Sequence, residues 1–346
     1  MRNGRGGGTL KSMSRIVFNH TYEDIISVEN LLAAWREFLK GKRRKRDVRE
    51  FQYQLADNIL SLHRDLVSQT YRHGGYYAFN ISDPKPRNIH KALVRDRLLH
   101  HALYRKLYPF FDKTFISNSY SCRKYKGTHR AVRAFKRYIA RAGRNDTKTV
   151  WVLKCDIKKF FASVDQRVLF EILQKRIQDA NILRLAGLVV ESFSSTVPGK
   201  GLPLGNLTSQ LLVNVYMNEF DQFMKHKLKA KYYIRYADDF VVLSGNKKEL
   251  EQTLRYIVVF LRDKLKLRLH PNKVSISTIA SGVDFLGWVH FPDHRVLRAM
   301  TKRRMFRVLA DTPKLAQLVS YQGMLTHGNT HGLSETIEMI AKRAYL

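Results

Sequence analysis

Two neighbouring carboxylates, Asp238 and Asp239, interrupt the apolar run IRYADDFVVLS at residues 234–244. The β-branched residues of this run favour a strand, on which successive side chains point to opposite faces. A hairpin turn at the pair would aim at least one carboxylate into a cleft. Adjacent acids in an apolar setting are unfavourable unless a cation neutralises them. The expected cation is Mg²⁺, which prefers hard oxygen ligands.

A further acid, Asp156, ends the apolar run VWVLKC and opens a polar turn. Asp156 and Asp238 together could hold two magnesium ions roughly 4 Å apart, and Mn²⁺ could substitute. One ion would activate a primer 3′-hydroxyl, and the other would hold a triphosphate and its leaving group, as in-line phosphoryl transfer requires. Alone, the pair is more often a turn with solvated acids, and a single strand-end Asp is more often a helix cap. Their combination in one basic chain favours the catalytic interpretation.

The charge of the chain indicates a polyanionic partner. The sequence of 346 residues holds 62 Lys and Arg against 29 Asp and Glu, a net charge of +33. Such a surplus exceeds what solubility needs and favours nucleic acid or an acidic membrane surface. The charge is spread along the chain, with denser runs at 40–46, 123–130 and 301–307, which suits a long phosphate-lined channel better than one membrane patch. Any single run could also be a solvated helix face.

The cysteine count, the hydropathy and the N-terminus argue against a disulfide-rich, membrane-spanning or secreted protein. Cys122 and Cys155 are too few for a disulfide framework, or for a zinc cluster without histidine help, so a reducing cytoplasm is expected. No run of about 20 apolar residues suggests a membrane span. The first residues, MRNGRGGGTLKSMS, do not form a signal peptide. We expect residues 1–21 to be a flexible basic lead.

The positioning elements follow from hydrophobic periodicity and from turn residues. The pattern interleaves helices with short strands and predicts an α+β fold. We expect helices at 22–70, 98–111, 166–194, 211–226 and 247–265, and a basic, mostly helical tail from Val296. Between them we expect extended segments around a turn at 76–97, a strand from 150, a Gly- and Pro-rich loop at 198–210, a hairpin at 231–245 and a strand-like segment at 283–291.

These pieces, in this order, resemble the motifs of reverse transcriptases from about residue 22 to residue 330. The Tyr-Ala-Asp-Asp box resembles the active site of that family, and Asp156 with Phe160 and Phe161 resembles its first aspartate motif. Further likenesses are the palm loop GLPLGNLTSQ (201–210), the fingers motifs (83–103), the lysine motif at Lys273 and the primer grip VDFLGW, with Phe285, Leu286 and Gly287. The combination is specific, although each piece alone is not.

Within that family, the chain looks most like the reverse transcriptases of diversity-generating retroelements. The palm loop ends in Ser209-Gln210, where many relatives have Ser-Pro, and the segments 117–132 and 320–333 also resemble that branch. Leu204 stands where many relatives carry Gln. Losing a polar check on base-pair geometry could lower discrimination by roughly 1–3 kcal/mol, which fits the error-prone copying of template adenines that this branch implies. The alternative is that Leu204 only packs under the loop.

The resemblance assigns roles to individual residues. It places Asp156, Ile157, Asp238 and Asp239 at the metal site, and Lys273 as a possible proton donor to the leaving pyrophosphate or, equally, a surface lysine. Phe161 matches the ring that would clash with a ribose 2′-hydroxyl and so select deoxynucleotides. The nucleotide-binding candidates are Lys85, Arg87, Arg123, Phe161, Leu204, Gly205 and Gln210, with Lys91 and Arg95 as alternatives among the bases.

The resemblance also implies a right-hand polymerase fold, with an antiparallel palm sheet backed by helices. The boundaries we expect are N-terminal helices and fingers at 22–149, a palm at 150–295 with a fingers insertion at about 166–197, and a short helical thumb at 296–346. From the length of this tail we expect no ribonuclease H or endonuclease domain. The implied partners are an RNA template, a DNA or RNA primer, deoxynucleotide triphosphates, structured retroelement RNA and a small basic accessory variability protein, with no membrane.

Two other functions compete with this interpretation. One is a different prokaryotic reverse transcriptase, of the phage-defence or domesticated group II intron type, without a mutagenic role. The other is an RNA-binding protein that keeps an inactive polymerase fold. Intact Asp156, Asp238 and Asp239 argue against the inactive form, and the palm loop favours the retroelement. In each enzymatic case the expected location is the cytoplasm of a prokaryotic or phage-infected cell.

Overall fold

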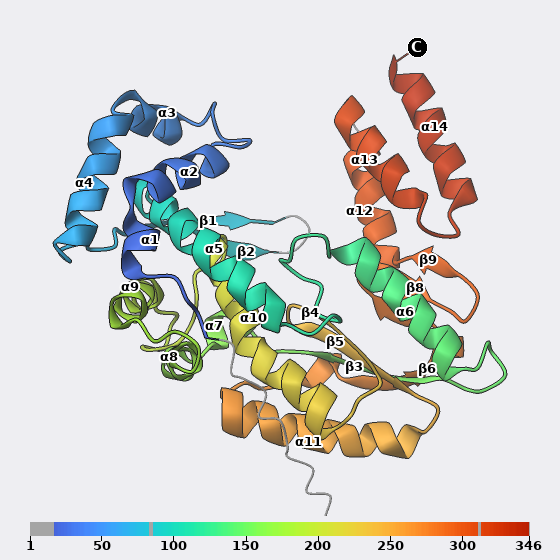
Figure 1. Cartoon of the computed structure of the whole chain (residues 1–346). Helices are drawn as coiled ribbons and strands as arrows, with labels where there is room; N and C mark the ends of the chain where they lie inside the picture. The colour runs from blue at the N-terminus through green and yellow to red at the C-terminus, as the bar shows by residue number, and fades with distance from the viewer. Residues whose placement is uncertain (1–16, 83–85, 311–312, 346) are drawn as a thin grey trace, which may run out of the picture.

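Four helices open the described part of the computed structural model, which covers residues 17–82, 86–310 and 313–345 (Figure 1). They confirm the helical prediction for 22–70. The first three pack with the long helix α5 (Val94–Thr114), and the fourth packs on the first three. The flexible lead expected at 1–21 lies largely outside the described residues. The four are α1 (Tyr22–Ile26), α2 (Val28–Phe38), α3 (Arg46–Tyr53) and α4 (Leu55–Val67).

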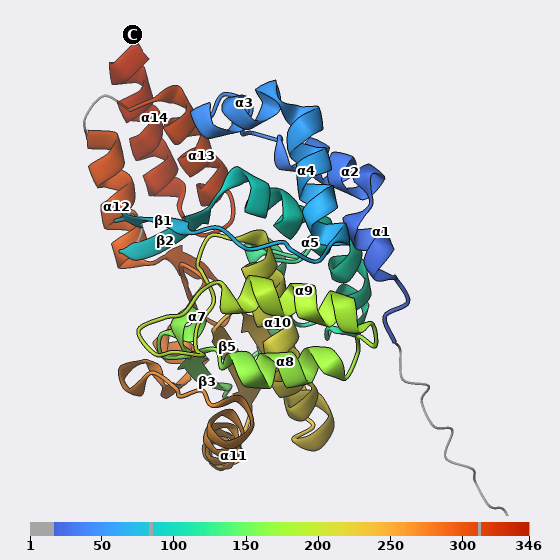
Figure 2. The same cartoon turned by 90° about the vertical axis from the view of Figure 1, so that its left-hand side faces the viewer.

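The strands β1 (Tyr76–Ile81) and β2 (Arg87–Ala92) form an antiparallel hairpin that projects from the N-terminal helices (Figure 2). We call this hairpin the β1–β2 arm. It matches the two extended segments predicted around a turn, and residues 83–85 of that turn lie outside the described residues. After α5 the chain forms α6 (Thr128–Ala142), a helix that sequence analysis did not predict. The basic run at 123–130 concealed its start, although Ala131, Phe135 and Ile139 recur at helical spacing and are buried.

A four-stranded antiparallel sheet in the order β4-β5-β3-β6 forms the centre of the molecule. On one face, Leu153 and Phe240 pack against the helices α10 (Leu207–Gln222) and α11 (Lys247–Leu265); on the other face, Val152 and Val241 pack against α6. Helices therefore cover both sides of the sheet and leave one end of it for the site. The strands are β3 (Trp151–Asp156), β4 (Tyr232–Tyr236), β5 (Asp239–Ser244) and β6 (Ser275–Thr278).

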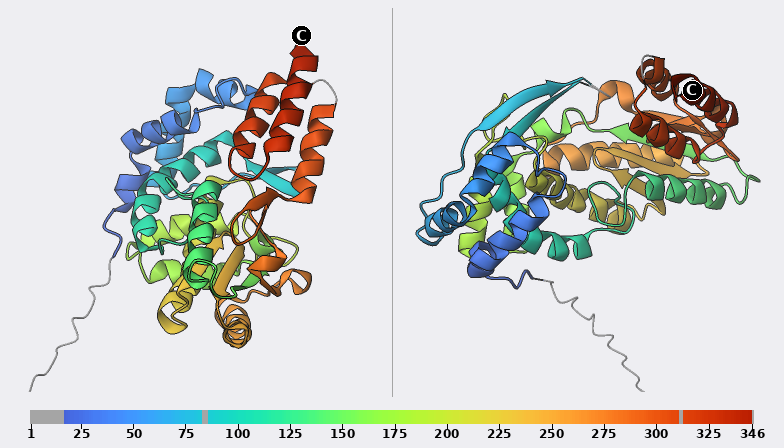
Figure 3. Two further views of the ribbon diagram at one scale, coloured as in Figure 1. Left: turned by 90° about the vertical axis from the view of Figure 1, so that its right-hand side faces the viewer. Right: turned by 90° about the horizontal axis from the view of Figure 1, so that it is seen from above.

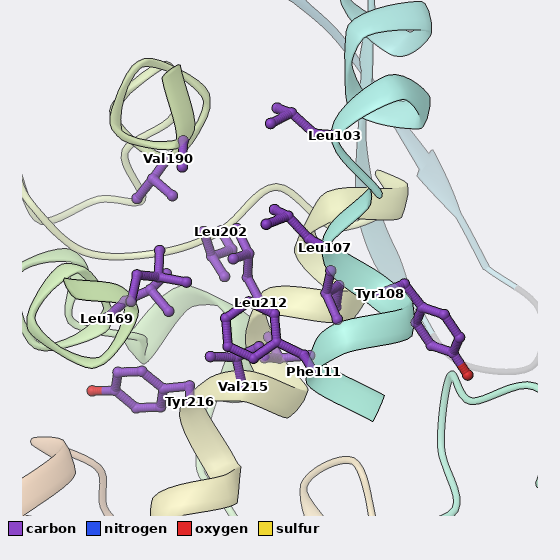
Figure 4. Packing of buried hydrophobic residues seen from close by; sticks show 14 of the residues in the cluster. Leu103, Leu107, Tyr108, Phe111, Leu169, Val190, Leu202, Leu212, Val215 and Tyr216 are labelled. Atoms are coloured by element: carbon purple, nitrogen blue, oxygen red, sulfur yellow. The ribbon is translucent and has the colours of Figure 1, made fainter. Parts of the chain in front are cut away.

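The helix α10 runs through the largest hydrophobic cluster (Figure 4). Side chains from α5, α8 (Gln166–Gln174) and α9 (Ala180–Glu191) surround it, including Leu107, Leu169 and Val190. The helix begins four residues earlier than predicted, so the loop prediction for 207–210 is wrong. The reason is local: the last Gly of the loop is Gly205, Asn206 is extended, and the following Leu207 already belongs to the apolar helix. A π-helical turn (Phe223–Lys227) extends the end of α10.

A small antiparallel sheet and three helices complete the chain, opposite the N-terminal helices (Figures 1 and 3). They share a cluster of their own, which includes Trp288, Met305 and Ile337. The tail is mostly helical, as predicted, except that its first residues form a strand. The elements are β7 (Val283–Phe285), β8 (Trp288–His290), β9 (Arg295–Leu297), α12 (Ala299–Ala310), α13 (Leu315–Leu325) and α14 (His331–Tyr345).

Three short turns connect these elements: the helical turn α7 (Phe160–Ser163) and two 3-10 turns, Pro271–Lys273 and Ile279–Ser281. Among the described residues, none of the helices has the length and apolar character needed to cross a membrane. Cys122 and Cys155 are both free thiols.

Candidate active site

The predicted hairpin carries the acid pair at its tip. Tyr236, the last residue of β4, pairs with Asp239, the first residue of β5, so the loop between them has only two residues. One of these, Ala237, has a left-handed backbone with φ of 56°, a conformation that costs free energy for a residue with a Cβ atom. The two-residue loop exposes Asp238 at the very end of the sheet and keeps Asp239 on the strand.

Asp156 lies directly opposite Asp239, because it is its partner in the β3–β5 register. Residues paired in this way project their side chains from the same face of the sheet, a few ångströms apart. The Ile157 N–H donates a hydrogen bond to the carbonyl oxygen of Asp238, at 3.3 Å, which ties the tip of the hairpin to the end of β3. Asp156 and the pair Asp238–Asp239, more than eighty positions apart in the sequence, therefore lie at the same end of the sheet.

The pKa of Asp239 reflects its burial and the repulsion from the other two acids. Burial, reinforced by the charges of Asp238 and Asp156 and opposed by Lys154, raises the pKa of Asp239 to about 6. Its Oδ1 atom is buried and accepts no hydrogen bond from the described residues. A buried carboxylate oxygen without a donor is unfavourable. The site therefore favours an added cation.

The donor set suits magnesium, since hard carboxylate oxygens are the ligands that Mg²⁺ prefers. Ile157 has a buried apolar side chain and can contribute only its carbonyl oxygen. Within the part of the chain that the structure describes, no three His, Cys, Asp or Glu side chains converge at metal-binding distance. The two-metal arrangement remains a prediction.

Lys273 lies beside Asp156, although 117 residues separate them in sequence. Its Nζ atom contacts both carboxylate oxygens, at 3.1 and 3.2 Å. Two backbone contacts bring the segment there: the His270 N–H donates to the Asp156 carbonyl at 2.8 Å, and Leu269 forms a β-bridge with Ile157. The lysine therefore neutralises one of the three acids in this structure.

A fully buried arginine, which sequence analysis missed, holds the hairpin in place. All five N–H groups of Arg235 are used. Two pair with the carboxylate of Asp221 on α10, at 2.8 and 2.7 Å. The others reach Asn214 Oδ1 at 3.2 Å, Ser119 Oγ at 3.0 Å and the carbonyl oxygen of Ala237 at 3.1 Å. The last contact fixes the two-residue loop directly.

The partner carboxylate is equally enclosed. Asp221 and Arg235 both have side chains with 0% exposure, and the Tyr233 hydroxyl donates to Asp221 at 2.7 Å. Burial, with the charge of Asp221, raises the pKa of Tyr233 well above its usual value, so this tyrosine stays protonated as a donor. A charged residue inside the apolar run YYIRY was the only signal in the sequence for this network.

The palm loop docks onto the β1–β2 arm. The His90 N–H donates to the Leu204 carbonyl, and the Asn206 side-chain amide donates to the His90 carbonyl, both at 3.0 Å. Gly205 has φ of 109°, and a Cβ atom there would approach the Ile89 side chain to 2.9 Å. Only glycine fits this junction without a shift. Leu204 is partly exposed beside the arm, so its side chain is not simply core packing.

The other predicted positions lie around this centre. Phe161 on α7 is half-buried and meets Phe160 edge-on, and Gln210 lies in the first turn of α10. Phe285 is buried, and Leu286 and Gly287 form the two-residue loop between β7 and β8, both with positive φ. A leucine in this conformation is unusual outside functional sites.

The cations proposed to meet the triphosphate differ in availability. Lys85 lies outside the described residues, and Arg87 is exposed at the start of β2. Lys91 pairs with Asp47 at 2.6 Å, and Arg95 pairs with Asp65. These two alternatives are therefore engaged with the N-terminal helices, which leaves Arg87 as the best-placed candidate.

Arg123 is also engaged internally. Its guanidinium contacts Asp112 Oδ1 at 2.6 Å and the carbonyl oxygens of Ile116 and Ser119 at 2.7 and 3.0 Å. Its side chain is only 5% exposed. This geometry favours a structural role for Arg123, and its role in nucleotide binding stays an untested prediction.

The sheet, its acid-bearing hairpin and the helical elements on either side define a right-hand polymerase fold, as predicted. Residues 82–290 match the family model described as reverse transcriptase (RNA-dependent DNA polymerase). The chain belongs to the reverse transcriptase family.

Curated relatives agree with this membership, and a solved structure shares the fold. Protein YkfC of Escherichia coli is 27% identical over 67% of this chain and 69% of its own length. The group II intron-encoded protein LtrA of Lactococcus lactis is 23% identical over 70% of this chain, and the match spans about half of LtrA, 51%. Telomerase of Candida albicans, solved with a fragment of telomeric RNA, shares the fold with a TM-score of 0.50 and 11% identity, covering 67% of this chain and 46% of its own.

Replacing Asp239 by Asn should remove a pH-dependent loss of stability. The folded carboxyl group holds its proton up to a pKa of about 6, against 3.8 in the unfolded chain. Without divalent cations, the free energy of unfolding should therefore fall by about 3 kcal/mol as the pH rises through this window. Urea unfolding in EDTA from pH 4 to pH 7 measures it. Identical pH profiles for wild type and Asp239→Asn would contradict the expectation.

Removing the partner of the buried arginine should be costly. Asp221→Ala leaves Arg235 charged and unpaired in the core, so we expect a loss of about 3–5 kcal/mol in unfolding free energy. The matched control is Glu219→Ala on the same helix, since Glu219 pairs with Lys175 at the surface, at 3.6 Å, and should cost about 1 kcal/mol or less. Equal losses in the two variants, measured by urea unfolding, would refute the expectation.

Proposed function

We propose that this protein is an RNA-directed DNA polymerase that extends a DNA or RNA primer along an RNA template with deoxynucleotide triphosphates. One observation carries the proposal: Asp156, Asp238 and Asp239 meet at one end of the palm sheet in a chain of the reverse transcriptase family. The net charge of +33 supports a nucleic-acid substrate. An inactive polymerase fold would have no need to keep three partly buried, mutually repelling acids together.

We propose a separate role for each group of residues at the end of the palm sheet. Asp156, Asp238 and Asp239, with the Ile157 carbonyl, would hold the divalent ions. Mg²⁺ held by these residues would supply the charge that activates the primer hydroxyl and neutralises the triphosphate. Lys273, next to Asp156, would protonate the leaving pyrophosphate.

Neighbouring elements would select and hold the substrates. Phe161 would exclude the ribose 2′-hydroxyl, Arg87 would meet the triphosphate, and the 285–287 loop would hold the primer. We propose fingers at 22–149, a palm at 150–295 with an insertion at about 166–197, and a thumb at 296–346.

Asp238→Asn tests the catalytic assignment. The amide keeps the shape of the side chain but removes the charge that an ion needs, so primer extension on a defined RNA template should fall at least roughly 100-fold. The control is Asp263→Asn, which removes an exposed acid paired with Arg262 at 2.7 Å on α11. Undiminished DNA synthesis by Asp238→Asn would refute the assignment.

Within this activity, we propose that the enzyme copies template adenines inaccurately and serves a diversity-generating retroelement. The support is the palm loop, in which Leu204 offers no amide and lies against the β1–β2 arm through its carbonyl bond to His90. An apolar side chain there cannot form hydrogen bonds that would distinguish a correct base pair from a mismatched one. The role would involve structured RNA and a small basic accessory protein in a prokaryotic cytoplasm.

Leu204→Gln tests the fidelity claim. Restoring an amide should improve discrimination by roughly 1–3 kcal/mol, which lowers misincorporation opposite adenine about tenfold. Sequencing of complementary DNA made on a defined RNA measures this, with Leu204→Met as a control that preserves the apolar character. The same adenine error rate in Leu204→Gln and wild type would contradict the claim.

A second candidate is a reverse transcriptase of the group II intron or phage-defence type without a mutagenic role. The similarity to LtrA favours it. Accurate copying of adenines by the wild-type enzyme, with its accessory protein present, would support this non-mutagenic function. Near-identical repeats in neighbouring DNA that differ mainly at adenines would support the retroelement function.

A further inference from the structure

The helix α6 presents a solvent face made almost entirely of cations. Arg133, Arg137 and Arg141 follow one another at four-residue spacing and are exposed. No acidic residue occurs between Arg123 and Asn145. The opposite face is fixed in the core by buried apolar residues, among them Ala134 and Phe135. The helix therefore cannot rotate its charges away.

The arginines of this face lack the acidic partners that are common on solvent-exposed helices. Exposed helices usually alternate charges, and like charges at four-residue spacing are destabilising. Among the described residues, no acidic side chain forms an ion pair with Arg133, Arg137 or Arg141, whereas α11 carries the pair Lys247–Glu251. A polyanion bound along α6 would relieve this repulsion.

Two hollows flank the helix and make it a ridge. One, of about 710 Å³, is lined by Tyr120, Lys126 and Arg130 on one side of α6. The other, of about 520 Å³, lies toward the loop between β8 and β9 and the turn between α13 and α14. Arg133 and Lys136 line both hollows. A phosphate backbone could follow either side of the ridge.

The second hollow adds an aromatic platform. The rings of Phe291 and His294 are stacked, with centroids 4.7 Å apart and planes at 10°, and both residues line the hollow beside Arg133. Cations next to stacked rings suit nucleic acid with unpaired bases, which are found in the loops and bulges of folded RNA.

The N-terminus of α6 touches the catalytic hairpin. The Thr128 hydroxyl donates to the Tyr236 hydroxyl at 3.1 Å, and the His129 ring lies 4.1 Å from that of His327 in the C-terminal helical unit. Figure 1 shows the rest of α6 leading away from this contact, along the side of the palm sheet and below α12 and α13. A ligand along the helix would be held in register with the active site without entering it.

We propose that α6 and its two flanking hollows, here called the α6 surface, form a docking site for a folded segment of RNA outside the substrate cleft. The proposal rests on membership of the reverse transcriptase family and not on infidelity at adenines. Like charges disfavour a basic protein as the ligand of this particular face. The arginine stripe, from 133 to 141, is long enough to contact several successive phosphates.

The test is binding of a fluorescent RNA hairpin that has an unpaired loop and no extendable end. A saturating short template–primer occupies the cleft throughout the measurement. The triple variant Arg133→Gln, Arg137→Gln and Arg141→Gln should bind the hairpin at least roughly tenfold more weakly. The slope of log affinity against log salt should fall by about 2. Primer extension on the short template should stay within about twofold of wild type, since the α6 surface lies outside the reacting centre.

Two controls make the result specific. Lys248→Gln, Arg255→Gln and Lys264→Gln remove the same charge from exposed positions of α11 and should leave hairpin binding unchanged. Arg→Lys at the three α6 positions keeps the charge and should retain binding, which separates lost contacts from misfolding.

Three outcomes would overturn the proposal. The first is hairpin affinity that is unchanged in the α6 Gln variant. The second is an equal loss of affinity in the α11 variant. The third is complete displacement of the hairpin by the short template–primer, which would place the RNA in the substrate cleft.

Discussion

The buried ion pair between Arg235 and Asp221 is the interaction on which the rest of the site depends. It joins β4 to α10 and, through Ser119, to the segment that precedes α6. Because the same guanidinium holds the Ala237 carbonyl, the strained loop that carries Asp238 is anchored from inside the protein. Water cannot compete for these bonds, since both side chains are fully enclosed. The hairpin is thus positioned by the core and leaves its tip free for chemistry.

The acids at that tip, unlike the ion pair, are held in an unfavourable electrostatic environment. Asp156 and Asp239 face one another across β3 and β5, and burial lifts the pKa of Asp239 to about 6. A fold selected only for stability would place apolar residues there. The ion pair below the hairpin has all its hydrogen bonds, whereas the buried Oδ1 atom of Asp239 has none from the described residues. The rigidity that the ion pair supplies lets this unfavourable carboxylate persist until a cation binds.

Sequence reasoning succeeded where a local pattern contains the answer. The hairpin at 231–245, the strand ending at Asp156 and the helix at 247–265 follow from periodicity and turn residues. It failed where long-range contacts decide. Arg235 looks like any charge in a strand until α10 supplies Asp221. Lys91, Arg95 and Arg123 likewise seem available until acids on other elements of the fold pair with them. The helix α6 was hidden because a basic run resembles a loop when the core that buries its other face is unknown.

The central claim is that the buried pair positions the catalytic loop, and a double substitution tests it most directly. Arg235→Met with Asp221→Leu replaces both charges by apolar groups of similar size, which buried pairs often tolerate, so the unfolding free energy should stay within about 3 kcal/mol of wild type. The Ala237 carbonyl loses its anchor, so kcat for primer extension should fall at least roughly 100-fold. A folded double variant with wild-type kcat would contradict the account.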